Sequence, residues 1–373
     1  FFFQPLLTMA SRESKFPMLP VEEALEKVLS LSVNRTHESV TLVKSIHRTI
    51  AKDALSPADL PSFPASMKDG YCISLDSDTD TNGRTYQILD TILAGRDISE
   101  FPQTIESNQA YKIMTGAPIP SSCNTVIMIE DTILQSKYEN GQEQSITITK
   151  SISQGRDVRG VGSDIKLGDV IMKKGETIGP AELGLLASCG LSEIDVFSKP
   201  IIGIMSTGDE VIDSFTNQSL QPGQIYDANR PLLQGLLSSY SNCIEIIDFG
   251  IIPDSENKLF PALEEAIDKI DILITSGGVS MGEVDLVKKW MQDNGSIEFG
   301  RVLMKPGKPL TFATFNRNNK TKLMFATPGN PVSSYVTSIL FVIPSIRSLI
   351  GIEDPNYPKI EITLRHNIRL DPQ

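Results

Sequence analysis

Hydrophobic positions in the second half of the chain alternate regularly between short apolar runs and longer amphipathic stretches. The apolar runs predict strands at 200–206, 243–252, 271–278, 299–304 and 322–329. Apolar residues at helical spacing predict helices at 229–240, 256–268, 284–294 and 331–350. Because strands that alternate with helices at this spacing form right-handed βαβ units, this half predicts a parallel sheet that is covered on both faces.

The first half of the chain has a different pattern. Residues 20–31 place apolar side chains on one helical face and charges on the other, so a helix is expected there. A proline-rich linker follows at 56–64, and from about 71 to 155 short alternating apolar runs predict a β-rich module. Another short helix is expected within 179–190. The fold class predicted for the whole chain is therefore multidomain α/β.

Composition narrows the possible functions. The net charge is −12, so a surface that neutralises the phosphates of a nucleic acid is not expected. The four cysteines are isolated and the three histidines lie far apart, which fits neither a zinc site nor a disulfide scaffold. The apolar run at 335–343 is about half as long as a membrane span requires. We therefore expect a soluble, cytoplasmic protein without a membrane span.

Polar clusters lie at the ends of several predicted strands. Ligands of open parallel sheets bind at the carboxyl ends of the strands, where the loops into the helices gather. Four clusters are expected at that edge, and a fifth, around Asp227, opens a helix. The four clusters are Thr207, Gly208 and Glu210; Ser276, Gly277, Gly278 and Ser280 with Asp285; Lys305, Pro306, Gly307 and Lys308; and Pro328 and Gly329 with Ser333.

The residue types in these clusters suit a phosphate ester that binds with a metal ion. Gly277 and Gly278 allow backbone N–H groups to face an oxyanion, and the N-terminus of the following helix adds a favourable dipole. Acids at Glu210, Asp227 and Asp285 would repel a bare phosphate, so they imply Mg²⁺, which prefers carboxylate, water and phosphate oxygens.

Lys305 and Lys308 supply positive charge for a second anion. Each cluster, taken alone, also has an ordinary structural interpretation. Residues 277–278 suit a tight turn, residues 328–331 a helix start, and residues 305–309 a solvated hairpin. The expected convergence of the clusters on one edge of one sheet favours a binding site.

Longer motifs extend these clusters along the chain. They are PSFPASMKDGY (61–71), MTGAPIP (114–120), STGDE (206–210), ITSGGVSMGEVD (274–285), RVLMKPGKP (301–309) and FATPGNPVS (325–333). In this order, over roughly residues 17–350, the chain resembles the molybdopterin molybdenumtransferase family, which includes bacterial MoeA and the gephyrin E domain. The resemblance implies that adenylylated molybdopterin and molybdate are the substrates. Molybdenum is then inserted with Mg²⁺-dependent release of AMP, the last step of molybdenum cofactor biosynthesis.

The resemblance also implies roles for individual residues. Phosphates of the nucleotide are assigned to Gly277, Gly278 and Ser280, and the wider substrate set adds Thr207, Gly208, Ser276, Pro306, Gly307, Pro328 and Gly329. Glu210, Asp227 and Asp285 are assigned to Mg²⁺ and the attacking water. Molybdate or the pterin phosphate is assigned to Lys305, Lys308 and Ser333. Asp69 and Thr115 are expected to reach the cleft from the other subunit of a homodimer.

The domain boundaries come from the same resemblance. A mixed α/β domain is expected at 17–68 and 156–197, with a β-rich domain inserted at 69–155. Residues 198–350 are expected to form the molybdopterin-binding domain, a three-layer α/β/α fold. Residues 355–373 are expected to be the first strand of an incomplete C-terminal β domain.

Two other functions compete with molybdenum insertion. One is a gephyrin-like scaffold with a relic pocket, favoured by the incomplete last domain. The other is the molybdopterin adenylyltransferase that prepares the substrate, which shares the α/β domain but lacks the N-terminal modules found here. An adenylyltransferase domain or protein is also a possible partner of this chain.

Overall fold

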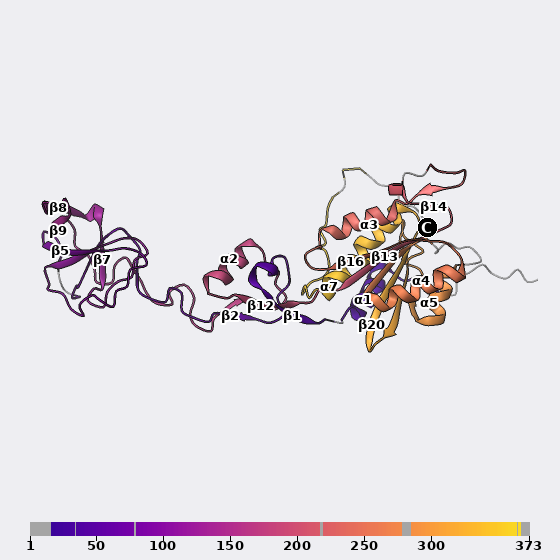
Figure 1. Cartoon of the computed structure of the whole chain (residues 1–373), viewed down its shortest axis with the longest axis horizontal. Coiled ribbons are helices and arrows are strands. Elements are labelled where there is room, and N and C mark those ends of the chain that lie inside the picture. Colours follow the sequence, from indigo (N-terminus) through magenta and orange to yellow (C-terminus); the bar gives the residue numbers. More distant parts are fainter. Residues whose placement is uncertain are drawn as a thin grey trace, which may run out of the picture. The chain divides into compact units, whose positions relative to one another are not determined.

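The computed structural model describes residues 16–33, 35–77, 80–216, 219–277, 285–363 and 365–366. Within these limits the chain divides into two compact units (Figure 1). The first unit is built from residues 1–53, 172–184 and 192–373, and the second from residues 54–171 and 185–191. The four domains inferred from the resemblance have different boundaries and stay a prediction.

The first unit contains a six-stranded sheet with the order β16-β13-β17-β20-β19-β18. β16, β13, β17 and β20 are parallel, whereas β19 and β18 add an antiparallel edge. The expected parallel sheet is therefore confirmed for four strands. The bounds are β13 (Ile201–Thr207), β16 (Glu245–Ile252), β17 (Ile272–Ser276), β18 (Ser296–Phe299), β19 (Thr311–Arg317) and β20 (Lys320–Thr327).

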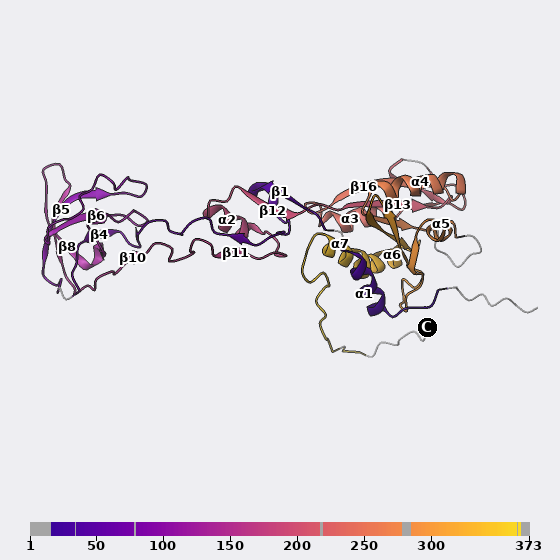
Figure 2. The same ribbon diagram turned by 90° about the horizontal axis from the view of Figure 1, so that it is seen from below.

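Helices cover both faces of this sheet (Figure 2). On one face α1, α3 and α7 bury apolar side chains such as Leu233 against Ile274. On the other face α4 and α5 bury Leu263 and Trp290 against Met205. The three layers confirm the α/β/α arrangement. The helices are α1 (Val21–Leu31), α3 (Asn229–Ser238), α4 (Glu256–Lys269), α5 (Leu286–Asn294), α6 (Pro331–Thr337) and α7 (Ile343–Leu349).

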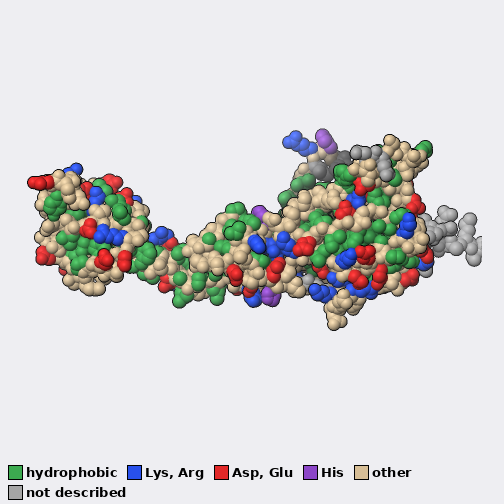
Figure 3. Space-filling view, in the orientation of Figure 1, with side chains coloured by type: hydrophobic (Ala, Val, Ile, Leu, Met, Phe, Trp, Pro, Cys, Tyr) green, Lys and Arg blue, Asp and Glu red, His purple; other side chains and the backbone are tan. Residues whose placement is uncertain are grey.

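The surface of the first unit mixes both signs of charge. Acidic and basic side chains are interspersed over the face seen in Figure 3. Several form ion pairs within or between helices, such as Lys289 of α5 with Glu256 of α4. Such exposed pairs contribute roughly 0–1 kcal/mol each, so the apolar layers hold the unit together.

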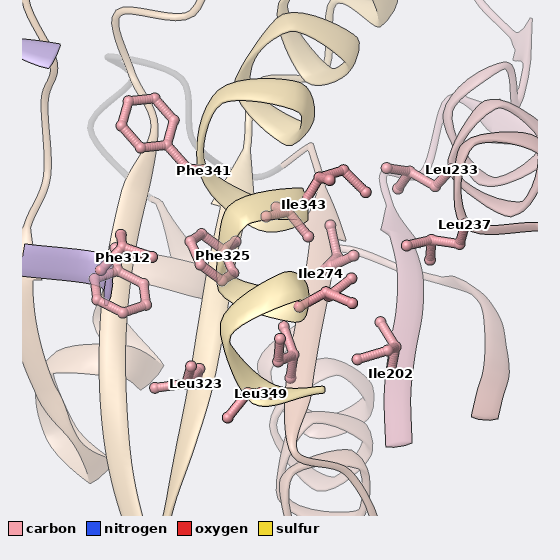
Figure 4. Packing of buried hydrophobic residues seen from close by; sticks show 14 of the residues in the cluster. Ile202, Leu233, Leu237, Ile274, Phe312, Leu323, Phe325, Phe341, Ile343 and Leu349 are labelled. Carbon is pink, nitrogen blue, oxygen red and sulfur yellow. The ribbon is translucent and has the colours of Figure 1, made fainter. Parts of the chain in front are cut away.

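The core beneath the last helix illustrates this packing. Figure 4 shows Phe325 and Ile274 from the strands facing Ile343 of the helix. The rings of Phe312 and Phe325 are stacked with centroids 4.7 Å apart. Burial of each such side chain contributes about 1.5–3 kcal/mol, which fixes the strands whose ends carry the predicted site.

The last helical segment is continuous from α6 through a π-helical turn, Ser338–Val342, into α7. By length and composition this segment, Pro331–Leu349, is apolar enough to cross a membrane, with a mean hydropathy of 1.4. However, 67% of it is buried inside the unit, where it packs on the sheet as a core helix. Length and composition alone are weak evidence for a membrane span.

The strand predicted at 299–304 is wrong. β18 ends at Phe299, and Val302 instead makes a parallel bridge with Leu19. The backbone of the following residue donates to Leu19 as well, so this apolar run pairs with the segment before α1 and not with the sheet. β19 was not expected, because Thr311, Thr314 and Asn316 interrupt its apolar run.

The second unit is the expected β-rich module. Its sheet has the order β7-β4-β6-β5-β9-β8. The sheet buries apolar side chains on both faces, including Ile73 on one side and the free thiol of Cys72 on the other. The strands are β4 (Gly70–Ile73), β5 (Thr85–Ile92), β6 (Gln109–Ile113), β7 (Thr125–Met128), β8 (Thr132–Lys137) and β9 (Glu143–Ile148).

Shorter elements complete the fold. Residues 358–363 form no strand, and their assignment to a further domain stays a prediction. The remaining elements are β1 (His37–Thr41), β2 (Ala54–Leu55), β3 (Ala65–Ser66), β10 (Val158–Arg159), β11 (Val170–Met172), α2 (Pro180–Ser188), β12 (Glu193–Phe197), β14 (Val211–Ile212) and β15 (Ile225–Tyr226).

Candidate active site

The carboxyl edge of the parallel strands gathers the predicted clusters of the first unit. β13 ends at Thr207, β17 at Ser276 and β20 at Thr327. β19 runs antiparallel to β20, so the loop 305–309 that precedes β19 arrives at the same edge. The topology therefore places the described residues of these four clusters along one edge, as the sequence predicts.

Backbone packs on backbone where these strands end. Gly277 has a φ of 89°, and a Cβ added there would lie 2.5 Å from the carbonyl oxygen of Thr207. Its amide donates to the carbonyl of Thr327 at 3.3 Å. A Cβ on Gly329 would lie 3.7 Å from the Cα of Gly277. Glycine is thus required at position 277 for both conformation and space. The neighbouring Gly278 and Ser280 lie outside the described residues.

Both carboxylate oxygens of Asp227 are already bonded, one of them to the cation of Arg230. Its Oδ1 accepts from the hydroxyl of Ser206 at 3.1 Å and from the amide of Asn229 at 3.0 Å. Its Oδ2 accepts from Nε of Arg230 at 2.7 Å. The hydroxyl of Ser206 also lies 2.9 Å from that of Ser276, which links β13 to β17. Asp227 therefore fixes the start of α3, and its predicted role as a metal ligand remains untested.

Arg230 is the centre of a buried ion cluster, which we call the Arg230 clamp. Its other two nitrogens reach Asp213 at 2.8 Å and Asp248 at 3.2 Å. Burial opposes the charge of the guanidinium, but the hydrogen bonds to Asp227 and Asp213 raise the pKa of Arg230 above its usual range. The clamp is Arg230 with Asp213, Asp227 and Asp248.

A second set of carboxylates has no such cation at its centre. We call Asp209, Glu210, Asp254 and Asp285 the acidic group. Burial raises the pKa of Asp254, and the nearby charges of Glu210 and Asp209 raise it further. The backbone amide of Asp254 donates to Asp209 at 3.2 Å, so the turns after β13 and β16 meet here.

Asp285 joins this group from the start of α5. Its Oδ1 caps the helix by accepting from the amide of Lys288 at 2.9 Å. Its Oδ2 is buried and has no hydrogen-bond partner among the described residues, and Nζ of Lys288 lies 3.7 Å away. Burial raises the pKa of Asp285, while Lys288 opposes the shift and Asp254 adds to it. This carboxylate oxygen is a ready ligand for a cation or a proton donor.

Sequence reasoning missed Asp254. The signal for it was present, because it follows the strand 243–252 and therefore lies at the same carboxyl edge.

The acidic group does not form a complete metal site by itself. Among the described residues no three or more His, Cys, Asp or Glu side chains are placed to hold a metal ion. Mg²⁺ is commonly held by only one or two carboxylates, with phosphate and water oxygens completing its shell. The unpartnered oxygen of Asp285, beside Asp254, fits that mode of binding.

The lysine loop borders a small cavity of about 180 Å³, lined by Met18, Lys305 and Lys308 among others. Gly307 has a φ of 107°, and a Cβ there would lie 2.6 Å from the methyl group of Thr337. Glycine at this position thus brings the loop against α6.

Ser333 lies in the first turn of α6 and is nearly buried. Its amide donates at 3.1 Å to Oδ1 of Asn330, the residue that caps this helix. The side chain of Asn229 donates to the carbonyl of Gly329 at 2.9 Å, which ties the starts of α3 and α6 together. Pro328 lies in the loop that follows β20, and Pro306 lies in the loop that precedes β19, both at this edge of the sheet.

Asp69 and Thr115 belong to the second unit and contact each other. Oδ1 of Asp69 accepts from the amide of Thr115 at 2.7 Å and from its hydroxyl at 2.9 Å. These hydrogen bonds hold the pKa of Asp69 below its ordinary value. The pair is therefore preorganised with an ionised carboxylate, whereas its predicted place in a cleft shared between subunits stays a prediction.

Another cavity, of about 850 Å³, lies away from these residues. It is lined by side chains of both charges, including Glu38, Arg48 and Glu245, around β1 and the starts of β13 and β16. None of the predicted site residues lines it, and its size alone does not make it the active site.

Comparison with known proteins identifies the family. Residues 19–190 match the model for the MoeA N-terminal region (domains I and II), and residues 203–348 match that for a probable molybdopterin-binding domain. The molybdopterin molybdenumtransferase of Haemophilus influenzae is 36% identical over 337 residues, covering 90% of this chain and 78% of that protein. The chain belongs to the molybdopterin molybdenumtransferase family.

Solved structures agree with this membership. Two crystal structures of the molybdopterin biosynthesis MoeA protein of Pyrococcus horikoshii have TM-scores of 0.74 and 0.73 and identities of 28% and 26%. They cover 90% and 91% of this chain, and the chain covers 81% of each. The MoeA-like fold predicted from the motifs is therefore confirmed.

Other relatives in the family are longer. The gephyrin of Dictyostelium discoideum is 39% identical over 400 residues and covers 96% of this chain. The molybdenum cofactor synthesis protein cinnamon of Drosophila melanogaster is 39% identical over 346 residues and covers 92%. The chain spans 54% and 53% of these two proteins, about half of their length.

Proposed function

We propose that the chain is a molybdopterin molybdenumtransferase. It takes adenylylated molybdopterin and molybdate, inserts molybdenum into the dithiolene and releases AMP. One observation carries the proposal in this member of the family. The bare backbone at Gly277, the unpartnered carboxylate oxygen of Asp285 and the Lys305–Lys308 loop all lie at one edge of the sheet.

Each part of this edge has a proposed task. The glycine turn after β17 binds the phosphates of the nucleotide, with Thr207, Gly208 and Ser276 beside it. Lys305, Lys308 and Ser333 bind molybdate or the terminal phosphate of the pterin. The clamped Asp227 positions the start of α3 against the loop at Gly329. Opposite charge in a partly dehydrated pocket would orient both anions before reaction.

Mg²⁺ is the proposed metal, held by Asp285 and Asp254 with Glu210 close by. When bound, it would offset charge on the phosphoanhydride and favour ionisation of a water molecule. Without it, burial raises the pKa values of both acids, the charges of Glu210 and Asp209 raise that of Asp254 further, and the charge of Asp254 adds to that of Asp285. The remaining ligands would be phosphate and water oxygens.

The proposal extends to the oligomeric state, the cellular location and a partner of the chain. We propose a homodimer in which Asp69 and Thr115 of one subunit complete the cleft of the other. We also propose a cytoplasmic location and an adenylyltransferase domain or protein that supplies the substrate.

The experiment is a direct assay of the purified chain. It is incubated with adenylylated molybdopterin, molybdate and Mg²⁺, while AMP is measured by chromatography and active cofactor by reconstitution of an apo-molybdoenzyme. We expect both products, and the double variant Lys305→Ala/Lys308→Ala should lose cofactor formation. Lys258→Ala, an exposed lysine on α4, is the matched control and should behave as the native chain.

Three other outcomes would contradict the proposal. AMP release without active cofactor would restrict the chain to hydrolysis of the substrate. No product at all would favour the scaffold with a relic pocket. Formation of adenylylated molybdopterin from ATP and molybdopterin would point to the adenylyltransferase.

A further inference from the structure

A second pocket lies at the amino edge of the same sheet. Its cavity measures about 240 Å³. Lys199 precedes β13, Asp271 precedes β17, and Lys320 begins β20, so the starts of three parallel strands contribute to its wall. Arg35 and the hydroxyl of Thr36 add the segment that follows α1. We call this cavity the amino-edge pocket.

The amino-edge pocket is separate from the candidate active site. β13 has seven residues, and at about 3.3 Å per residue its two ends lie on the order of 20 Å apart. None of the residues assigned to the proposed function lines the amino-edge pocket. The inference is therefore independent of that function.

The charges of this pocket are unbalanced. Its acid, Asp271, is already paired, because Oδ1 lies 3.2 Å from Nζ of the nearly buried Lys322 and Oδ2 accepts from the amide of Ile201 at 2.9 Å. By contrast, within the described part of the chain Arg35, Lys199 and Lys320 form no ion pair with an acid. Three cations thus line a concave space in a protein whose net charge is −12.

Hydrogen bonds hold the segments that carry these cations. Nη2 of Arg35 donates to the hydroxyl of Ser348 at 3.0 Å, and that hydroxyl donates to the carbonyl of Ser32 at 2.9 Å. The amide of Ser198, beside Lys199, donates to the carbonyl of Thr36 at 2.8 Å. The segments at 35–36 and 198–199 therefore meet through backbone. The guanidinium of Arg35 keeps further N–H donors for a ligand.

A tight turn positions the third cation. Asn318 and Asn319 have φ values of 50° and 60°, the conformation of a two-residue hairpin between β19 and β20. Lys320 follows directly, and Lys322 points to the same face two residues on. One lysine neutralises Asp271, while the other is left for the pocket.

We propose that the amino-edge pocket binds a small tetrahedral oxyanion of the phosphate class. A guanidinium, two ammonium groups and the hydroxyls of Thr36 and Ser198 match the charge and the acceptors of such a dianion. The volume lies below the roughly 300–1,000 Å³ of pockets that enclose larger organic ligands, so the pocket suits a small anion better than a whole nucleotide. Free phosphate, sulfate and molybdate share this chemistry.

The test measures oxyanion binding by titration calorimetry at constant ionic strength, with chloride as the balancing anion. Sodium phosphate, sulfate and molybdate are titrated separately into the double variant Lys305→Ala/Lys308→Ala, which removes the other proposed anion site. We expect saturable binding of at least one of the three, and the strongest of them identifies the source. Adding Lys199→Ala and Lys320→Ala should weaken that binding at least tenfold.

Two controls separate a built site from general attraction to lysine. Lys258→Ala in the same background should leave the affinity unchanged. Arg35→Lys should weaken binding although it preserves charge, because an ammonium group cannot replace the fork of a guanidinium. Thermal unfolding of each variant verifies that these side chains can be changed without loss of the fold.

The proposal is overturned if none of the three anions binds saturably. It is also overturned if the Lys199→Ala/Lys320→Ala variant binds as tightly as its parent. Loss of affinity to the same degree in Lys258→Ala would show attraction to surface charge only and would equally refute a site.

Discussion

The Arg230 clamp and the acidic group lie at the carboxyl edge of the same sheet, yet they treat their carboxylates in opposite ways. In the clamp, three acids surround one buried guanidinium. An amide hydrogen bond from Phe215 and the charge of Arg230 lower the pKa of Asp213. In the acidic group, burial and neighbouring acids raise the pKa values of Asp254 and Asp285.

This difference distinguishes carboxylates that stabilise the fold from carboxylates that are candidates for chemistry. Acids that are paired with a buried cation contribute to folding, and removal of the cation leaves them uncompensated. Acids that gather without a hydrogen-bonded cation repel one another in the folded chain, and such arrangements cluster at functional sites. Asp227 was predicted as a metal ligand on the same grounds as Asp285, but of these two acids only Asp285 has a buried oxygen without a hydrogen-bond partner among the described residues.

The largest expected effect comes from the centre of the clamp. Arg230→Ala should lower the free energy of unfolding by about 3–5 kcal/mol, because it leaves three carboxylates without their cation. Urea denaturation measures the change. Arg317→Ala is the matched control. Its guanidinium reaches Glu264 at 2.8 Å near the surface, so a loss of only about 0–1 kcal/mol is expected. Equal losses in the two variants would show that the clamp is an ordinary surface network.

The glycine turn after β17 should respond next. Gly277→Ala should destabilise the chain by roughly 2–3 kcal/mol, since it combines a left-handed φ with a Cβ 2.5 Å from a carbonyl oxygen. Gly223→Ala provides the comparison. That glycine has a φ of 88° with nothing within 4 Å, so only the conformational cost of about 1 kcal/mol remains. If both variants lose the same stability, the close approach to Thr207 has no energetic consequence.

The smallest expected effect comes from removing one acid charge, which should stabilise the fold in the acidic group and destabilise it in the Arg230 clamp. Folding raises the pKa of Asp254, so its charge destabilises the fold increasingly as pH rises from the ordinary value of 3.8 through the folded-state pKa. Asp254→Asn should therefore raise the unfolding temperature slightly at neutral pH, with no gain in acid.

Asp213→Asn should do the reverse. The pKa of Asp213 is lowered, so its stabilisation is present above 3.8 and is lost as pH falls through the folded-state pKa. Unfolding temperatures of both variants are compared with the native chain across this pH range. The comparison fails if Asp254→Asn is destabilised at neutral pH.

The sequence predicted this edge of the sheet because parallel strands have a simple rule. The apolar runs that became β13, β17 and β20 end in Thr207, Ser276 and Thr327, and such ends must share one edge. Runs that depend on a distant partner were less predictable. Val302 looked like part of a strand, but its backbone pairs with Leu19, which no local pattern reveals.

The pattern of hydrophobic and polar positions does not predict the environments of individual side chains. Asp227 and Asp285 look equivalent in the sequence, since each stands at a helix start with a cation three residues on. The fold separates them, because Nε of Arg230 lies 2.7 Å from Asp227 whereas Nζ of Lys288 lies 3.7 Å from Asp285. Asp254 was overlooked because its proximity to Asp209 and Glu210 arises only where two separate turns meet.

The most direct measurement is the rate of AMP release by Asp285→Asn as a function of Mg²⁺ concentration. Asparagine also caps helices well, so α5 and the fold should be preserved. We predict at least a ~100-fold loss of rate with an equal or higher unfolding temperature. Asp293→Asn, an exposed acid on the same helix, should keep the native rate. Native turnover with an unchanged Mg²⁺ requirement in Asp285→Asn would contradict the account.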